Sequence, residues 1–213
     1  MKNLIIIGAG GMGREVYNLA IQCPEYNTDF IVKGFLDDNI NALDKFDNYY
    51  PPILRDIKNY CVEENDFFTC SIGSVLLKKQ CIEIISKKGG KFLSLIHPTV
   101  LINPTAKIGI GVLVFPYAKI TSHTSVGDFA LIQSFANIGH DVIVGDYTRI
   151  DTYVLCIGGV KIGNNVTIHS KVILNHKVVV EDNATVGAAS FVIKRVEEGT
   201  TVYGNPARLL YKK

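Results

Sequence analysis

The sequence predicts an α/β N-terminal domain with a small Rossmann-like parallel sheet, followed by a left-handed parallel β-helix. The β-helix prediction rests on a six-residue repeat that runs without insertion from residue 102 to residue 197, because a fixed hexapeptide period marks this architecture. The α/β prediction rests on a glycine-rich turn after an apolar run, and on the alternation of strand-like and helix-like segments that follows. A chain of 213 residues is long enough for both domains.

Within the repeat, every sixth residue is aliphatic or nearly so, and the residue four places later is small or β-branched. The first set contains no charged residue: Ile102, Ile108, Val114, Ile120, Val126, Ile132, Ile138, Val144, Ile150, Cys156, Ile162, Ile168, Leu174, Val180, Val186 and Val192. A helix or an alternating strand would space its apolar residues by three to four or by two. Three hexads make one triangular turn, so residues 18 apart should stack at about 4.8 Å.

Three parts of the chain are expected to follow one another. Residues 1–97 should form the α/β domain, residues 98–197 the β-helix, and residues 198–213 a C-terminal cap. A cap is expected because an open end of a β-helix exposes unpaired strand groups. In the α/β domain the pattern predicts strands at 3–7, 30–36, 66–72 and 92–96, and helices at about 14–22 and 75–88.

The glycine-rich turn of the α/β domain indicates a phosphate-binding loop. Residues 8–13 read Gly-Ala-Gly-Gly-Met-Gly between a strand and a helix, which matches the GxGxxG pattern that brings phosphate oxygens to backbone N–H groups. The expected carboxyl ends of the parallel strands, where ligands bind in such sheets, carry Gly10, Gly11, Asp37, Asp38 and Gly73. The alternative is that the glycines only permit close packing of the helix.

The size of the α/β domain favours a mononucleotide or a nucleotide sugar over NAD(P). A full dinucleotide fold contains two βαβαβ halves, and this segment, which ends near residue 96, supplies one. We therefore expect a sugar-nucleotide-binding domain.

Composition argues against several classes of partner. The net charge is +2 with 20% charged residues, so the chain offers no basic excess for nucleic acid or an anionic membrane. The five cysteines lack CxxC spacing, which argues against a zinc site and a disulfide framework. The N-terminal apolar run is too short for a transmembrane helix and lacks a signal-peptide cleavage pattern. We expect a cytoplasmic protein that binds no metal and no nucleic acid and does not insert into a membrane.

One corner of the predicted β-helix carries groups with no structural reason to be there. His140 stands beside Asp141 on an outward turn, and steps of 18 residues lead to Gly158 and then to His176. A histidine can take a proton near neutral pH, and an adjacent carboxylate can hold its tautomer. Gly158 leaves room for a ligand, and its N–H could meet a developing oxyanion. The alternative is a solvent-facing histidine without a chemical role, whereas Cys156 is expected in the core.

Six segments occur in a specific order along essentially the whole chain. They are IIIGAGGMGREV at 5–16, GFLDD at 34–38, SIGS at 71–74, LIHPT at 95–99, IGHDVIVGD at 138–146 and GNPAR at 204–208. In this set the chain resembles the hexapeptide-repeat sugar acyltransferases of the NeuD/PglD type. That family includes bacterial UDP-aminosugar N-acetyltransferases and sialic-acid O-acetyltransferases.

The resemblance implies a homotrimer with each acetyl-CoA site in a groove between neighbouring β-helices, and no metal. It implies that His140 is the general base and Asp141 its supporting carboxylate. Contacts with acetyl-CoA would come from Arg149, Gly158, Ser170 and Ala188. The sugar nucleotide would contact Gly10, Gly11, Met12, Asp37, Asp38, Gly73 and Lys78. Met12 and Arg149 stand where a number of relatives have histidine.

The leading interpretation is transfer of an acetyl group from acetyl-CoA to an amino or hydroxyl group of a nucleotide-activated sugar, for the biosynthesis of surface-glycan or glycoprotein sugars. The alternatives are a sialic-acid O-acetyltransferase, a non-catalytic trimeric β-helix scaffold, and an enzyme whose α/β domain binds NAD as a regulator. The sequence leaves open the sugar, the nucleotide, the choice between nitrogen and oxygen, and the length of the acyl group.

Overall fold

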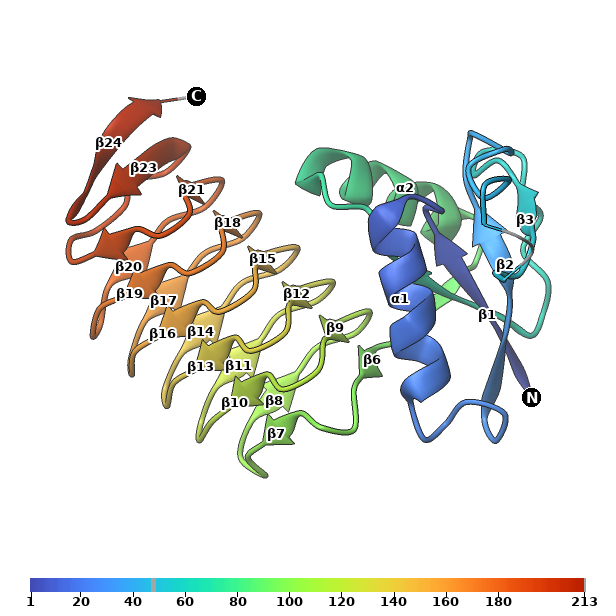
Figure 1. Cartoon of the computed structure of the whole chain (residues 1–213), viewed down its shortest axis with the longest axis horizontal. Helices are drawn as coiled ribbons and strands as arrows, with labels where there is room; N and C mark the ends of the chain where they lie inside the picture. Colours follow the sequence, from blue (N-terminus) through green and yellow to red (C-terminus); the bar gives the residue numbers. More distant parts are fainter. Residues whose placement is uncertain (47–48, 213) are drawn as a thin grey trace. The chain divides into compact units, whose positions relative to one another are not determined.

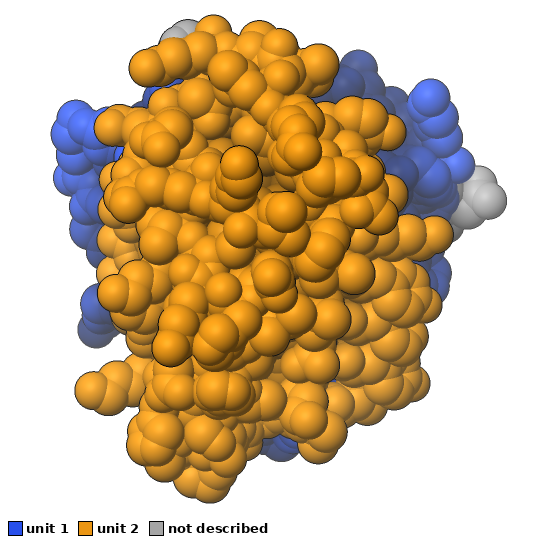
Figure 2. All heavy atoms as spheres, turned by 90° about the vertical axis from the view of Figure 1, so that its left-hand side faces the viewer, with its two compact units in different colours: residues 1–98 blue, residues 99–213 orange. Residues whose placement is uncertain are grey.

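The computed structural model of the protein describes residues 1–46 and 49–212 (Figure 1). The chain divides into two compact units, Met1–Pro98 and Thr99–Lys213, which Figure 2 colours separately. The first is called unit 1 and the second unit 2. The structure confirms the predicted fold class, an α/β domain followed by a left-handed parallel β-helix.

Unit 1 is built on a parallel sheet with the strand order β3-β2-β1-β4-β5. Its strands are β1 (Lys2–Ile7), β2 (Phe30–Leu36), β3 (Ile53–Arg55), β4 (Asp66–Cys70) and β5 (Lys91–Phe92). Its helices are α1 (Gly11–Gln22) and α2 (Val75–Lys87). The residues Leu4 to Ile7 of β1 are fully buried, as expected for a strand between two others in a parallel sheet.

Three details of unit 1 differ from the predicted elements. The expected strand at 92–96 is two short strands, β5 and β6 (Leu95–Ile96). Helix α1 begins at Gly11, three residues earlier than predicted. The predicted start was too late because glycine has a low helix propensity and no other start signal stands at residues 11–13. Strand β3 was not predicted, since three residues after two prolines carry too little pattern to be recognised.

Unit 2 coils so that three sheets form its sides. The first sheet contains β7 (Leu101–Ile102), β10 (Lys119–Ile120), β13 (Asn137–Ile138), β16 (Leu155–Cys156), β19 (Ile173–Leu174) and β22 (Phe191–Val192). The second contains β8 (Lys107–Ile108), β11 (Ser125–Val126), β14 (Ile143–Val144), β17 (Lys161–Ile162) and β20 (Val179–Val180). The third contains β9 (Leu113–Val114), β12 (Leu131–Ile132), β15 (Arg149–Ile150), β18 (Thr167–Ile168) and β21 (Thr185–Val186). Figure 1 shows these strands stacked turn upon turn.

The register of unit 2 is the predicted one. Ile138 pairs with Cys156, and Cys156 pairs with Leu174, so residues 18 apart stack in parallel strands. The second residue of each strand points inward, and Cys156 is fully buried as expected. At the corners, the chain takes left-handed backbone conformations at non-glycine residues such as Asp141, with φ of 58°.

The C-terminal end of unit 2 departs from the hexad rhythm. Leu174 and Val180 are six residues apart, but their pairing partners Val192 and Val196 are only four apart. The prediction of a full last hexad is therefore wrong, because this corner is two residues shorter. The chain then forms β23 (Thr200–Gly204), which adds to β21, and β24 (Ala207–Lys212), which pairs antiparallel with β23. Over residues 1–46 and 49–212, no helix combines the length and apolar character that spanning a bilayer requires.

Candidate active site

The imidazole of His140 and the carboxylate of Asp141 form a dyad on the corner that follows β13. The His140 Nδ1 lies 2.7 Å from the Asp141 Oδ2, and both side chains are about three-fifths exposed, at 63% and 61%. The hydrogen bond from His140 lowers the pKa of the Asp141 carboxyl. An ionised carboxylate can only accept, so in the neutral imidazole Nδ1 carries the proton and Nε2 keeps its lone pair. The dyad is therefore arranged to take a proton at Nε2.

Gly158 lies directly against the ring of His140 on the next turn. A Cβ atom at Gly158 would sit 2.4 Å from both Cε1 and Nε2 of His140, so a side chain there would displace the ring. The backbone beside it is fixed, because the Gly159 N–H donates to the His140 carbonyl oxygen at 2.8 Å. Within the described part of the chain the Gly158 N–H makes no hydrogen bond. The corner thus places a free N–H donor close to the imidazole.

His176 follows on the same corner, one turn beyond Gly158. His140, Gly158 and His176 each stand two residues after their strand, in the register that joins Asn137, Leu155 and Ile173. Two turns separate the histidines by about 10 Å, too far for one metal ion to bind both. The described residues contain no group of three His, Cys, Asp or Glu that could hold a metal ion.

A second ionic cluster lies on the third sheet. At its centre is Asp151, which is 4% exposed. Its Oδ1 lies 2.5 Å from Arg149 Nε. Its Oδ2 lies 3.2 Å from Arg149 Nη2 and 3.2 Å from His169 Nδ1. The sequence prediction named Arg149 but missed Asp151 and His169. The sequence contained a signal for this cluster. Arg149 and Asp151 are two residues apart, so they share a face of an extended strand, and His169 follows Asp151 by one turn of 18 residues.

The residues predicted for catalysis and for acetyl-CoA binding lie on two different corners and on β15 of one chain. His140, Asp141 and Gly158 are on the corner between the first and second sheets. Ser170 and Ala188 stack 18 residues apart on the corner between the third and first sheets, and Arg149 lies on β15. The structure therefore brings His140, Asp141 and Gly158 together, but not these three with the others.

In unit 1, the glycine-rich turn contains two kinds of glycine. A Cβ at Gly13 would lie 2.1 Å from the carbonyl oxygen of Gly8, and Gly8 has a φ of 96°. The close approach at Gly13 and the left-handed backbone at Gly8 account for these two glycines without a ligand. In contrast, a Cβ at Gly10 would meet nothing within 4 Å, and one at Gly11 would only approach Arg14 at 3.9 Å. Protein packing therefore does not fill the space at Gly10 and Gly11, at the start of α1.

The other predicted sugar-nucleotide residues surround this turn in unequal ways. Asp37 accepts hydrogen bonds from the N–H groups of Ala9 at 2.7 Å and Asn39 at 2.8 Å, so its carboxylate holds the glycine turn. Asp38 accepts one from the Ile57 N–H at 3.4 Å. Lys78 is 3% exposed within α2, whereas Met12 and Gly73 are partly exposed.

The chain is similar to several known proteins in sequence and in fold. The model of the PglD N-terminal domain matches residues 3–85. The acetyltransferase domain of PglB from Neisseria gonorrhoeae FA1090 superimposes with a TM-score of 0.86 and 27% identity, covering 99% of this chain and 100% of that one. Residues 3–85 thus belong to the PglD N-terminal domain family.

Two further proteins resemble this chain. The UDP-N-acetylbacillosamine N-acetyltransferase of Bacillus subtilis (strain 168) is 25% identical over 117 residues, so the match spans 54% of this chain and about half, 51%, of that relative. PerB from Caulobacter crescentus, solved with CoA and GDP-perosamine, has a TM-score of 0.87 with 21% identity, over 98% of this chain and 97% of that one. At that identity the likeness to PerB establishes the fold.

Proposed function

We propose that the protein transfers an acetyl group from acetyl-CoA to an amino group of a nucleotide-activated sugar, with His140 as general base. The observation that carries the proposal is the dyad of His140 and Asp141 with Nε2 beside the glycine gap at Gly158. Similarity to a protein named UDP-N-acetylbacillosamine N-acetyltransferase favours an amine over a hydroxyl acceptor. A cytoplasmic location fits an enzyme that draws on acetyl-CoA.

In this mechanism the acceptor amine attacks the thioester carbonyl directly. The Nε2 of His140 takes a proton from the amine as the new C–N bond forms, and Asp141 stabilises the resulting imidazolium. The developing oxyanion can accept a hydrogen bond from the free N–H of Gly158. The C–S bond then breaks, and the CoA sulfur leaves with the proton from His140. Each step uses groups already on this corner of unit 2.

Unit 1 is proposed to hold the nucleotide part of the acceptor. The start of α1 offers backbone N–H groups at Gly11 and its neighbours, which favour a phosphate by hydrogen bonding and by the helix dipole. The unfilled space at Gly10 and Gly11 lets a phosphate approach the backbone. Asp37 contributes by fixing the turn through the Ala9 N–H.

We further propose that a homotrimer completes the acetyl-CoA site. Within one chain, Ser170 and Ala188 lie on a corner other than that of His140. A neighbouring copy could supply Arg149, Ser170 and Ala188 opposite His140. Asp151 would then position Arg149, because its carboxylate is buried and bonded to two nitrogens of the guanidinium.

The proposal is tested by measuring free-thiol release from acetyl-CoA with UDP-, GDP-, dTDP- and CMP-linked aminosugars. We expect release only when acetyl-CoA and one nucleotide aminosugar are both present. The matched control is the same nucleotide sugar with a hydroxyl in place of the amine. Release with the hydroxyl compound alone would reassign the reaction to O-acetylation. A correctly folded protein that releases no thiol with any acceptor would overturn the proposal and favour a scaffold.

A further inference from the structure

Three aromatic rings stack on one corner of unit 2, between the third and the first sheet. Tyr117, Phe135 and Tyr153 each stand two residues before a strand of the first sheet, namely β10, β13 and β16. The ring centroids of Tyr117 and Phe135 are 5.1 Å apart, those of Phe135 and Tyr153 are 4.9 Å apart, and both pairs are stacked. We call these three residues the aromatic ladder.

The coil does not require aromatic side chains at these positions. The backbone of the aromatic ladder is left-handed, with φ of 62° to 63°. The same backbone position on other corners carries polar residues or glycine at several turns, such as Asp141, Gly159 and Asn165. A bulky residue takes this conformation at a cost, whereas asparagine and glycine take it readily. The chain therefore keeps three rings where the fold alone would favour smaller side chains.

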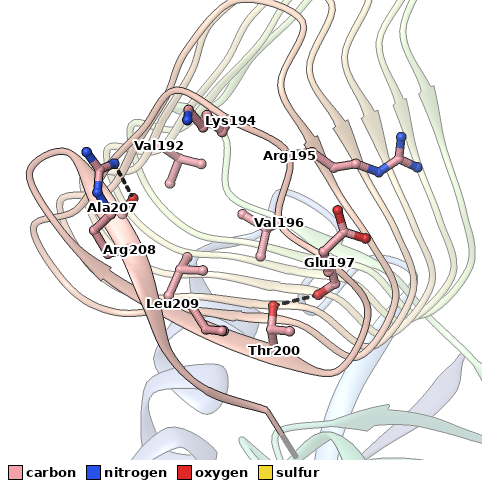
Figure 3. Close-up of a pocket in the computed structure, with 10 residues that line it drawn as sticks. Val192, Lys194, Arg195, Val196, Glu197, Thr200, Ala207, Arg208 and Leu209 are labelled. Carbon is pink, nitrogen blue, oxygen red and sulfur yellow. Dashed lines mark hydrogen bonds between the residues drawn. The ribbon is translucent and has the colours of Figure 1, made fainter.

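The described chain leaves the aromatic ladder exposed. Its members are 60%, 44% and 54% exposed in chain order. By contrast, Phe129, which stacks on Tyr147 in a second aromatic pair of unit 2, is 8% exposed. The hairpin of β23 and β24 folds over the last turn, where it lines a pocket with Val192 of β22 (Figure 3), two turns beyond β16. Exposed aromatic surface on successive turns indicates an interaction site.

The aromatic ladder and the dyad stand at the two ends of the same strand. Phe135 is two residues before β13, and His140 is two residues after it, so the first sheet lies between the two corners. The outer face of this sheet exposes apolar side chains, with Leu101 of β7 at 67% and Ile173 of β19 at 39%. An apolar face between the two corners suits contact with further copies of the chain.

A cyclic assembly with the first sheet toward its axis joins these two corners. When triangular coils surround an axis parallel to their own, the corner at one edge of the inner sheet meets the corner at the other edge on the next copy, in a head-to-tail contact. Rotation about that axis keeps every turn at its own height. The neighbour's Phe135 and Tyr153 are therefore level with His140 to within one turn, about 4.8 Å. Ser170 and Ala188, on the same corner as the aromatic ladder, stand one and two turns beyond Tyr153.

We propose that the aromatic ladder of a neighbouring copy packs against the corner of the dyad, and that its Phe135 and Tyr153 form the wall of the reaction site beside His140 Nε2. Aromatic side chains are frequent anchors of protein interfaces. Here they cover the exposed His140 and Asp141 and exclude water from the proton that is transferred. The inference rests on the proposed acetyltransferase function and assigns residues of a second copy to its site.

Mixed assemblies test whether two copies share the site. The double variant Phe135→Asn, Tyr153→Asn removes the rings and keeps residues that tolerate the left-handed backbone. Alone, it should release thiol at least about tenfold more slowly than the wild type, and His140→Ala should also be impaired. The two variants are co-expressed with different tags and purified through both tags. Each mixed trimer then contains one site with an intact His140 facing intact rings, so activity should return to roughly a third of the wild type. Mixed assemblies that stay inactive, or a fully active double variant, would overturn the inference.

The stability of the assembly gives a readout that does not need acetyl transfer. Light scattering during dilution should show that the double variant dissociates at a roughly tenfold higher concentration than the wild type, because two rings are lost from the interface. Tyr147→Asn is the matched control, because it removes a stacked ring at a φ of 57° from the corner that does not border the first sheet. It should dissociate as the wild type does.

These measurements separate failure of this inference from failure of the proposed function. A weakened assembly of the double variant, in a protein whose wild type transfers no acetyl group, would refute the proposed function but keep the aromatic ladder at the interface. Equal dissociation of the double variant and Tyr147→Asn would overturn the inference, whether or not the wild type transfers acetyl groups.

Discussion

His140 owes its orientation to two neighbours that act in different ways. Asp141 holds Nδ1 at 2.7 Å, which fixes the tautomer, while Gly158 leaves the space into which the ring fits. The side chain of His140 is itself 63% exposed, so packing alone does not hold the imidazole in place. The reactive geometry therefore depends on one hydrogen bond and on one missing Cβ atom.

The substitution Gly158→Ala tests the second of these effects. Gly158 does not require a left-handed conformation, and the exposed His140 ring can move aside, so the free energy of unfolding should change by less than about 1 kcal/mol. Turnover should nevertheless fall by roughly 10²-fold, because the displaced imidazole no longer meets the amine. Thermal unfolding and thiol release measured on the same preparation check both expectations. A variant with normal kcat would show that the position of the ring does not matter.

At the scale of residues, the sequence predicted the positions that the repeat determines, but it did not predict the hydrogen bonds that depend on side-chain conformation. The 18-residue period converts sequence distance into spatial distance, so the placement of His140, Asp141 and Gly158 could be inferred without a structure. The bonds of Asp151 to Arg149 and His169 depend on rotamers, which no repeat specifies. The two hydrogen bonds that the Asp37 carboxylate accepts from backbone N–H groups likewise depend on the local backbone conformation.

At the scale of elements, a ladder of hydrogen bonds fixes the corner between the second and third sheets. The members of this ladder are Asp128, Asp146, Asn164 and Asp182. The side-chain oxygen of each one accepts a hydrogen bond of 2.8 to 2.9 Å from the backbone N–H of the residue 18 positions earlier. A glycine stands just before Asp128, Asp146 and Asn164. A Cβ at Gly127 would lie 2.3 Å from the Asp146 carboxylate. The recurring glycine-Asp/Asn pair is therefore a structural device of the coil.

We expect Asn164→Ala to destabilise unit 2 by about 1 kcal/mol. The change removes the acceptor of the Asp146 N–H, and a typical hydrogen bond contributes about that much. Asn137→Ala is the matched control, because Asn137 is exposed on β13 and its side chain makes no hydrogen bond to a described residue. The midpoint of urea unfolding should therefore be lower for Asn164→Ala than for Asn137→Ala. Equal midpoints would contradict a stabilising role for the ladder.

In unit 1 a buried ionic network joins β2 to β4. Asp66 is 1% exposed and accepts hydrogen bonds from Lys33 Nζ at 3.0 Å, from the Tyr60 hydroxyl at 2.7 Å and from the Glu63 N–H at 2.9 Å. Burial raises the pKa of the Asp66 carboxyl, but these hydrogen bonds outweigh it, so the pKa is lowered overall. Burial also raises the pKa of Tyr60 to about 12, together with its bond to Asp66.

This network predicts a dependence of stability on pH. Because the folded-state pKa of Asp66 lies below its unfolded value of about 3.9, its contribution is complete above that value and is lost as the pH falls through the folded-state pKa. Lys33→Met should destabilise unit 1 by about 3 kcal/mol at neutral pH, since it leaves a buried carboxylate without its cation. Acid unfolding of the variant should begin at a higher pH.

Hydrogen exchange of the β2 and β4 amides, followed from about pH 3 to about pH 7, measures this effect. Lys2→Met is the control, because the Lys2–Asp29 pair is exposed and should contribute less than about 1 kcal/mol. Equal loss of protection in Lys33→Met and Lys2→Met across this pH range would show that the buried Lys33–Asp66 pair stabilises unit 1 no more than the exposed pair does.

The elements that sequence reasoning missed share a physical cause. The long, strongly periodic β-helix was predicted turn by turn, whereas β3 is three residues long and β5 and β6 are two each. Such short strands depend on the sheet that they join more than on their own residues. The short corner before Val196 also escaped detection, because Val196 is buried whether the corner has four or six residues.

At the scale of the whole molecule, the proposed chemistry is divided between two units. Unit 2 carries the dyad, and unit 1 carries the open glycine turn. The function requires both, because an acetyltransferase must bind a donor and an acceptor at once. A β-helix by itself does not imply an activity, so we infer catalysis from His140, Asp141 and Gly158 on the corner between the first and second sheets.

The most direct test of the central claim is steady-state thiol release by His140→Ala, with acetyl-CoA and the nucleotide aminosugar that the wild-type protein accepts. With His140 as general base, turnover should fall by roughly 10²- to 10⁴-fold, and light scattering should show an unchanged oligomeric state. His123→Ala, one turn earlier on the same corner, should stay within about tenfold of the wild type. Near-normal turnover of His140→Ala in an intact assembly would contradict the assignment of His140 as general base.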